Sequence, residues 1–505
     1  MLHISLLSVG GEKIAEGTWH RSCKMLDLFK LAHRAKPGLQ IKILHGSSKL
    51  NPQMCLDILD QKLGCVSLTV IFAETAQKQQ LSILGGAFAA IKEDGSVVSW
   101  CDAASCVDSS SVADELQEGV VQVVGNVGAF AVVKYDGSVV SWGKAASGGD
   151  SSSVADRLQE GVVQVVRNLY AFAAIKDDGS VVSWGDTASG GDSSSVADKL
   201  RWGVVQVVGN VGAFAAIKED GSVVSWGDTA SGGDSSSVAD KLQEGVVQVV
   251  GNVCAFAAIK NNGSVVLWGS EFFMGDISSV ADQLQEGVVQ VVGNVGAFAA
   301  IKGDGSVVSW GQAGSGGDSS LVADKLQEGV AQVVGNVDAF AAIKDDGSVV
   351  SWGNAELGGD SSSVADKLQK GIVQVVGHIG AFAAIKEDGS VVSWGDTASG
   401  GDSSSVADRL QEGVVQVVGN CCAFAAIKED GSVVSWGDAA SGGDSSSVAG
   451  KLQGGVVQVV GNVGAFAAIK HNGSVVSWGK AAFGGDSSSV ADKLQEGVVQ
   501  VVGNV

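Results

Sequence analysis

Residues that could perform acid–base or nucleophilic chemistry are few in most of this chain. From residue 87 onward it contains only two histidines, His378 and His471, each an isolated replacement within a repeated pattern. A Ser-His-Asp grouping requires one histidine held beside one nucleophile in a unique arrangement. The repeated copies instead present the same serines and aspartates many times without a histidine, so the sequence predicts a protein that is not an enzyme.

The aspartates and cysteines of the repeats could suggest a metal site. Asp234 recurs in every copy and Asp240 in all but one, where Gly450 replaces it. The nine-residue glycine-aspartate period of calcium-binding β-rolls is absent, however, and the two residues suit a turn and a helix start. Cys101 and Cys106 could pair or bind a metal, yet no second ligand pair with zinc spacing accompanies them. No phosphate-binding glycine loop follows a predicted strand. We therefore expect no catalytic, cofactor-binding or metal site.

The cysteines also bear on the compartment. Eight cysteines in 505 residues do not form a disulfide framework, and Cys254 and Cys422 simply replace the glycine found at Gly212. This sporadic usage favours a reducing compartment. The first residues lack the basic and apolar regions of a signal peptide, and no apolar run approaches the ~20 residues of a membrane span. A cytoplasmic or nuclear location is expected.

Charge divides the chain into two parts. Residues 1–86 carry 10 Lys/Arg and 6 Asp/Glu, whereas the rest carries 23 and 49, so the net charges are +4 and −26. An acidic surface repels phosphate backbones and anionic lipid, so we expect neither nucleic acid nor membrane as a partner. The alternative is that the acidity only keeps a large array with an apolar core in solution.

From residue 87 onward, the serines, aspartates, cysteines and histidines discussed above lie in copies of one 42-residue unit, which is seen clearly over Gly212–Val253. Its tryptophan recurs ten times at intervals of 42, from Trp100 to Trp478, which is typical of a propeller, solenoid or array. Within the unit, AFAAIK and SVVSW are joined by Glu219-Asp220-Gly221, a strong hairpin signal. VVQVV predicts a third strand, and SSSVADKLQEG predicts one or two helical turns.

These strands have little polar/apolar alternation. FAAI has no polar position, and VVQVV has only Gln248 in the unit chosen here. We therefore expect both faces of each small sheet to be covered, which requires the copies to stack on one another.

The repeats resemble a known class of β-propellers. VVSWG after x-Asp-Gly, preceded by AFAAIK, resembles the blade core of the regulator of chromosome condensation family and of its three-stranded relative, the β-lactamase inhibitor protein II type. The resemblance covers residues 87–505 and implies a mainly β fold with ten propeller-type blades. Those rings have seven blades, and the helical segment here is atypical. Pairing of the last strand, Val498–Val505, with Ala87–Lys92 would complete a blade and close a ring, but an open superhelix is the alternative.

Residues 1–74 form a separate unit, followed by a linker over 75–86. The segments KILHGSSKL (Lys42–Leu50) and VSLTVIF (Val66–Phe72) resemble two strands of ubiquitin, so this part resembles a ubiquitin-like β-grasp domain of the α+β class. Such domains carry an exposed apolar patch, which here would comprise Leu44 and Ile71 beside His45. The alternative is that Leu44 and Ile71 cover the repeat array or lie on the surface without a role.

A second set of candidate binding residues lies in the loop after Trp-Gly, where the copies differ most. Apolar side chains replace the usual small residues there, and they could form a partner-binding patch or cover neighbouring blades. They are Phe272, Phe273, Met274, Leu357 and Phe483.

These features predict a non-catalytic scaffold that joins a ubiquitin-like domain to a propeller-type protein-binding surface. The resemblances imply protein partners, namely ubiquitin receptors or other ubiquitin-pathway components at the N-terminal domain and an unknown partner at the repeat loops. One alternative is the substrate-recognition part of a HECT-type ubiquitin ligase, whose catalytic domain is not in this sequence. The other is a guanine-nucleotide exchange factor for a small GTPase.

Overall fold

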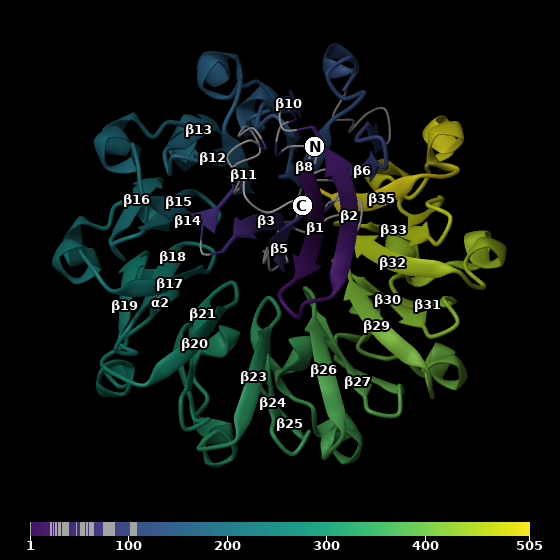
Figure 1. The fold of residues 1–505 in the computed structure, drawn as a ribbon. Coiled ribbons are helices and arrows are strands. Elements are labelled where there is room, and N and C mark those ends of the chain that lie inside the picture. Colours follow the sequence, from purple (N-terminus) through teal and green to yellow (C-terminus); the bar gives the residue numbers. More distant parts are fainter. Residues whose placement is uncertain are drawn as a thin grey trace.

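The structure is a computed structural model of the 505-residue chain. It describes residues 2–20, 40–46, 48–50, 65–73, 86–101 and 109–504, together with six single positions in the N-terminal part. Those positions are Cys23, Met25, Leu28, Ala32, Leu56 and Leu59. Two regions are described below, an N-terminal sheet and a long array of small sheets (Figure 1).

The N-terminal sheet has five strands in the order β2-β1-β5-β3-β4. Its central pair, β1 and β5, is parallel, while β2 and β3 flank them antiparallel and β4 pairs with β3. The buried residues of one face pack on Met25, Leu28 and Ala32, of which Leu28 and Ala32 are helical. The strands are β1 (Leu2–Ser8), β2 (Lys13–Trp19), β3 (Gln40–His45), β4 (Ser48–Lys49) and β5 (Cys65–Ala73).

Each sheet of the array has three antiparallel strands, and the AFAAIK strand is in the middle. It forms the predicted hairpin with VVSWG. On its other edge it pairs with the VVQVVG strand that precedes it in the sequence, so each sheet combines parts of two successive 42-residue copies. The VVQVVG strands lie nearest the common axis and the VVSWG strands lie outermost (Figure 1).

The strands have nearly identical bounds in every sheet. The inner strands are β8 (Val120–Gly125), β11 (Val162–Arg167), β14 (Val204–Gly209), β17 (Val246–Gly251), β20 (Val288–Gly293), β23 (Val330–Gly335), β26 (Ile372–Gly377), β29 (Val414–Gly419), β32 (Val456–Gly461) and β35 (Val498–Gly503). The middle strands are β9 (Ala129–Lys134), β12 (Ala171–Lys176), β15 (Ala213–Lys218), β18 (Ala255–Lys260), β21 (Ala297–Lys302), β24 (Ala339–Lys344), β27 (Ala381–Lys386), β30 (Ala423–Lys428), β33 (Ala465–Lys470) and β6 (Phe88–Lys92). The outer strands are β10 (Val139–Gly143), β13 (Val181–Gly185), β16 (Val223–Gly227), β19 (Val265–Gly269), β22 (Val307–Gly311), β25 (Val349–Gly353), β28 (Val391–Gly395), β31 (Val433–Gly437), β34 (Val475–Gly479) and β7 (Val97–Trp100).

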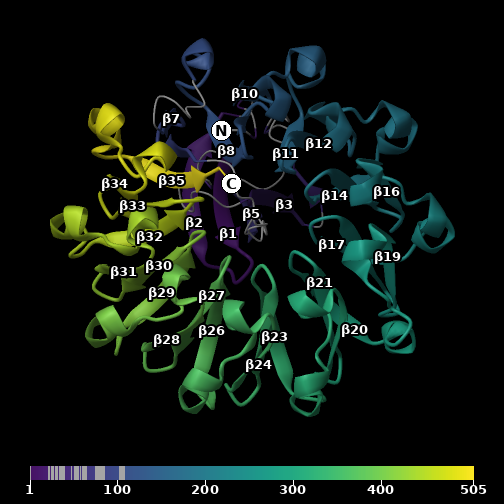
Figure 2. The ribbon, with the colours of Figure 1, turned by 180° about the vertical axis from the view of Figure 1, so that it is seen from behind.

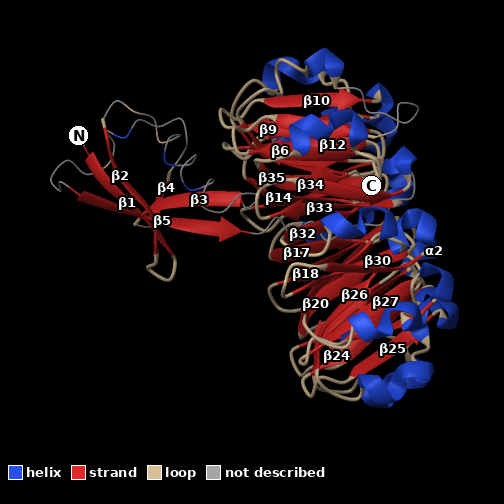
Figure 3. Cartoon of the chain, turned by 90° about the vertical axis from the view of Figure 1, so that its right-hand side faces the viewer, coloured by secondary structure: helices blue, strands red, loops and turns tan. Residues whose placement is uncertain are grey.

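Short helical turns connect each outer strand to the next inner strand and lie at the periphery of the array (Figure 3). All are seven residues or shorter, because Gly and Asp interrupt the segment, and only α2 (Glu271–Met274) is an α-helix among the described residues of the array. The others are Ser110–Val112, Ala145–Ser147, Ser152–Arg157, Thr187–Gly191, Ser194–Leu200, Thr229–Ser231, Ser236–Leu242, Ala281–Leu284, Ala313–Ser315, Ser320–Lys325, Ala355–Gly359, Ser362–Leu368, Thr397–Ser399, Ser404–Arg409, Ala439–Gly443, Ser446–Lys451, Ala481–Phe483 and Ser488–Leu494.

Adjacent sheets bury the aromatic residues between them. Phe214 and Trp226 stack with their ring centroids 5.3 Å apart, and both are almost fully buried. The indole Nε1 of Trp226 donates to the carbonyl oxygen of Gly190, 36 residues earlier, at 3.0 Å. The alanines of the preceding middle strand lie in the same cluster, and their small side chains leave room for the two rings.

The last strand of the chain pairs with the first strand of the array. β35 is antiparallel to β6, with the same register shift as every internal pair of inner and middle strands. Trp100 Nε1 donates to Gly484 O at 3.0 Å, and Asn504 Oδ1 accepts from Ala87 N, which are the contacts of the internal sheets. The predicted completion of one blade from both ends of the repeat region is therefore confirmed, and both face views show the sheets arranged around one axis (Figures 1 and 2).

The prediction that both faces of every strand are covered is wrong for the inner strands. A β-bulge between Val246 and Gln248 leaves Val247 without a register partner on the middle strand, and the side chain of Val247 is 59% exposed. A bulge adds one residue to one strand and re-aims the side chains around it. The VVQVV strand therefore presents apolar surface to solvent.

Candidate protein-binding surfaces

The turn aspartates of the repeats hold the backbone in place. Asp220 Oδ1 accepts hydrogen bonds from Ser222 N at 2.9 Å and from Ser222 Oγ at 2.6 Å. These bonds, the one from Oγ above all, lower the pKa of Asp220 below its ordinary value. Gly221 follows with φ of +74°, a conformation that favours glycine.

The aspartates of the connecting segment have the same kind of role. Asp234 Oδ1 accepts from Ser236 N at 2.8 Å, and Asp228 Oδ2 accepts from Ser231 Oγ at 2.7 Å. Side-chain bonds of this type stabilise turns and helix starts. Across the described residues, no group of three or more His, Cys, Asp or Glu side chains is arranged to hold a metal ion.

The two histidines of the array differ in burial. His378 is buried in a slot that Asn occupies in the other copies, accepts from Gly380 N at 3.2 Å, and lies against Phe424 with ring centroids 4.1 Å apart. Burial is the main cause that lowers the pKa of His378 to about 4. His471 lies on an exposed hairpin turn.

The residues of the predicted N-terminal patch lie on the sheet face opposite the buried one. Ile43 pairs with Val70 and both are buried, so Leu44 and Ile71, the next residue on each strand, point to the opposite face. In the antiparallel register these two side chains are diagonal neighbours, and both are half-buried. His45 follows Leu44 and is also half-buried.

The apolar loop residues of the array are only partly accessible. Phe272, on α2, is 71% exposed, and its ring packs edge-on against that of Phe273 at 5.3 Å. Phe273 and Met274 are half-buried, and Met274 packs on the apolar cluster between its sheet and the next one.

Phe273, Leu357 and Phe483 occupy one slot in three different copies, the slot of Ser231. In each case the backbone carbonyl accepts from the amide of an asparagine 21 residues earlier, as the carbonyl of Ser231 does. Phe483 also packs on the cluster between the last and first sheets. Phe273 packs against Phe272 in its own copy, but Leu357 and Phe483 lie in two other copies, so the structure does not bring all four side chains into one patch.

The sequence analysis missed a set of exposed valines on the inner strands. They share the second position of VVQVV, at the bulge, and their exposed fractions lie between 43% and 61%. We call this set the valine circle: Val163, Val205, Val247, Val289, Val373, Val415 and Val457. A β-bulge cannot be read from VVQVV itself, but an apolar residue precedes Gln in all ten copies, nine times as Val, and this recurrence was a signal in the sequence.

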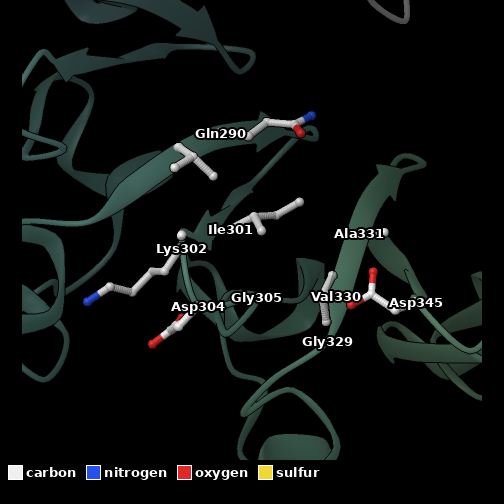
Figure 4. A pocket seen from close by; sticks show the side chains of 11 residues that line it. Gln290, Ile301, Lys302, Asp304, Gly305, Gly329, Val330, Ala331 and Asp345 are labelled. Atoms are coloured by element: carbon white, nitrogen blue, oxygen red, sulfur yellow. The ribbon is translucent and has the colours of Figure 1, made fainter.

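One copy lacks the exposed valine, and a pocket of about 310 Å³ lies there between β20 and β23 (Figure 4). Ala331 replaces the circle's valine there, and Gly303 replaces a larger turn residue of the other copies. A Cβ atom added to Gly303 would meet nothing closer than 3.8 Å, so both replacements leave space at one place. Val289 supplies an apolar wall, and Asp304 and Asp345 come from two neighbouring turns.

Comparisons with known proteins give only distant similarity. No family model matches the chain, and no curated protein matches it. Among solved structures, human WBSCR16 is 19% identical over 52% of this chain and 84% of its own, with a TM-score of 0.31. Prp20p of Saccharomyces cerevisiae, described with its binding to Gsp1p and histones, is 14% identical over 61% and 93%, with a TM-score of 0.31. The C-terminal domain of gp131 from bacteriophage phiKZ is 10% identical over 77% and 98%, with a TM-score of 0.32.

These similarities are too low to carry an argument about function. The chain is a mainly β protein of repeated three-stranded antiparallel sheets, which fits a propeller-type repeat architecture. None of the helices described is long and apolar enough to cross a bilayer.

Proposed function

We propose that the protein is a non-catalytic scaffold of the cytosol or nucleus. A ubiquitin-like domain over residues 1–74 is joined through 75–86 to a ring of ten blades over 87–505, and each part binds protein. The valine circle carries the proposal for the ring, because exposed apolar side chains repeated on a rigid framework mark interaction sites.

The pattern of buried contacts supports a closed ring. Among the described residues, ten apolar clusters lie between successive sheets, whereas an open row of ten sheets would have nine. The tenth cluster joins Phe88, Trp100 and Val501 of the sheet β35-β6-β7 to Ala465 of the sheet β32-β33-β34. Closure also removes two exposed strand edges, which would otherwise invite association.

The strand order supports the ubiquitin-like assignment. A central parallel pair with an antiparallel hairpin on one side is what a β-grasp domain requires, and the order β2-β1-β5-β3-β4 has both. Leu44 and Ile71 then lie where the resemblance puts the patch that ubiquitin receptors recognise, with His45 beside them. A receptor domain would cover these apolar side chains on that face of the sheet.

Charge indicates the chemistry of the ring's partner. The array has a net charge of −26, and the valine circle lies beside the acidic hairpin turns. In the pocket, Val289 and Ile301 can cover the aliphatic part of a Lys or Arg side chain, while Asp304 and Asp345 pair with its charge. We therefore propose a protein segment with both apolar and basic residues as the ligand.

Site-specific crosslinking tests the ring surface. A photoreactive phenylalanine at position 247, within the valine circle, should capture a discrete protein partner in cells. The matched control is position 321, because Leu321 is 99% exposed but stands alone on a helical turn. Equal capture at both positions would contradict the proposal that the circle is the binding surface.

The N-terminal domain is tested separately by its affinity for a purified ubiquitin-receptor domain. Replacing Leu44 and Ile71 together by Ala should abolish binding by the full chain. Ser67→Ala, on the same face of β5 and exposed, should leave binding unchanged. Unaltered binding by the double variant would remove the ubiquitin-pathway role while leaving the ring surface as a separate question.

A further inference from the structure

Two adjacent cysteines distinguish one copy of the repeat from all others. Cys421 and Cys422 lie between β29 and β30, where most copies have Val at the first position and Gly is the commonest residue at the second. Their sulfur atoms are 3.0 Å apart, with the thiol of Cys421 donating to the sulfur of Cys422. Both residues are half-buried and both are free thiols.

The backbone around the pair is held in place on both sides. Asn420 Oδ1 accepts from Cys422 N at 3.0 Å and from Ala423 N at 2.9 Å, and Cys422 O accepts from Asp438 N at 2.8 Å. These are the contacts of the other copies, so the fold presents two thiols at a rigid position without any special distortion of the chain.

We propose that Cys421 and Cys422 are a redox-active thiol pair that a peroxide oxidises to a disulfide between adjacent residues. The thiolate of Cys422 attacks one peroxide oxygen and becomes a sulfenic acid, while the other oxygen leaves and takes up a proton to form water or an alcohol. The thiol of Cys421 then attacks the sulfur of Cys422, and water leaves. With hydrogen peroxide, two thiols give one disulfide and two waters.

The hydrogen bond between the two thiols assigns their roles. The hydrogen bond from Cys421 is the largest cause that lowers the pKa of Cys422 to about 7, and the same bond raises the pKa of Cys421. Lys480, from the next copy, favours the thiolate, whereas Asp438 and Asp396 oppose it. A thiolate is the form that reacts with peroxide, so Cys422 is the attacking residue and Cys421 the resolving one.

The chain contains its own control in Cys254. This residue occupies the slot of Cys422 in another copy, but Val253 precedes it instead of a cysteine. Cys254 accepts only a long hydrogen bond of 3.7 Å from Ser231 Oγ, and burial raises its pKa. The same fold position thus holds one thiol with a second thiol beside it and one thiol with only a hydroxyl beside it.

The experiment treats the full chain with hydrogen peroxide at pH 7, alkylates the free thiols and maps the products by mass spectrometry. We expect the peptide with Cys421 and Cys422 to lose two hydrogens, resist alkylation and recover on reduction. Cys254 should stay alkylatable or be trapped as a sulfenic acid by dimedone. Without peroxide, Cys422 should be alkylated at least about tenfold faster than Cys254.

Cys421→Val supplies the matched variant, because it restores the residue found in most other copies and should fold normally. We expect Cys422 in this variant to react as slowly as Cys254 and to give a dimedone adduct instead of a disulfide. Two results would overturn the proposal: an unchanged alkylation rate of Cys422 in the variant, or sulfenic acids without a disulfide in the parent protein.

Discussion

Two interfaces of the array make the same contacts between residues that are separated by very different lengths of chain. At an internal interface, Trp226 reaches a carbonyl 36 residues away, whereas at the interface between the last and first sheets Trp100 reaches Gly484, 384 residues away. The side chains and distances are the same. The residues of the repeat therefore specify each contact between neighbouring sheets. Whether the first and last sheets become neighbours depends on the number of copies. Stacking of the other sheets brings the ends together, so the closing contact requires no long flexible loop.

The strongest test of this comparison removes the tryptophan from each interface. Trp100→Ala and Trp226→Ala each delete a buried ring and one indole hydrogen bond, so each should lower the free energy of unfolding by about 3–5 kcal/mol. Thermal or denaturant unfolding of the two variants measures the costs. If the array is closed in solution, the two costs are similar.

An open array would break that equality. Trp100 would then keep its stacking on Phe88 but lose Gly484 and the cluster contributed by the last sheet. A cost for Trp100→Ala much below that for Trp226→Ala would therefore contradict closure.

The next test concerns the glycines that join turns of successive sheets. Gly473 and Gly221 have φ near +73°, and a Cβ atom on either would lie 2.4 Å or 2.6 Å from the backbone nitrogen of Gly497 or Gly245. Gly473 contacts the start of β35, so it tests the closing strand, while Gly221 tests an internal one. Alanine at either position should cost about 1–3 kcal/mol of unfolding free energy. A cost at Gly221 alone would indicate that β35 is loosely held.

His378 is an internal position at which the repeat pattern is interrupted, and it makes stability depend on pH. Its pKa falls from 6.5 when the chain is unfolded to about 4 in the fold, so the unfolded chain binds the extra proton first. Stability is therefore complete above pH 6.5 and decreases as the pH falls toward 4. At pH 5 the loss should be about 2 kcal/mol relative to neutral pH.

His378→Asn restores the residue of the other copies and should remove this pH-dependent loss. In those copies the asparagine amide donates to the carbonyl of the Ser231 slot, for example from Asn210 at 2.6 Å. Melting curves at pH 5 and pH 7 for both proteins give the comparison. The turn aspartates add little to the difference in stability between pH 5 and pH 7, because their pKa values are lowered from an ordinary value of 3.8. An identical pH response of the two proteins would exclude His378 as the cause.

Much of the blade could be predicted from the residues themselves. The period of 42, the Asp220-Gly221 turn and the apolar runs specify the hairpin, because each is a local property of the chain. The pairing of β35 with β6 was also predictable, since an unpaired strand remained at each end of the repeats. The helical assignment of SSSVADKLQEG was only partly correct, because it forms short turns with tighter winding than an α-helix.

The binding surface was harder to predict for a physical reason. Exposure of Val247 depends on a bulge, which is a property of two paired strands, and the pocket depends on Ala331 and Gly303 meeting across two blades. Neither can be derived from one strand's pattern. Phe272 is exposed on α2, whereas Met274 and Phe483 pack against the clusters between adjacent sheets, and partner binding by these three residues stays a prediction.

The smallest effect on stability should come from the valine circle. Val247→Ser changes a side chain that is 59% exposed, so the free energy of unfolding should change by no more than about 0.5 kcal/mol. Val499, its counterpart on the closing strand, is half-buried against the first interface, so Val499→Ser should cost somewhat more, about 1 kcal/mol. Val246→Ser is the buried control and should cost more than either, since Val246 is only 3% exposed. If Val247→Ser costs as much as Val246→Ser, the exposed valines are structural and the circle is not a free binding surface. The other outcome is that Val247→Ser leaves stability unchanged and weakens crosslinking of the partner from position 205. The internal interfaces then leave this valine available to a partner, whereas the interface formed by the closing strand partly covers its counterpart Val499.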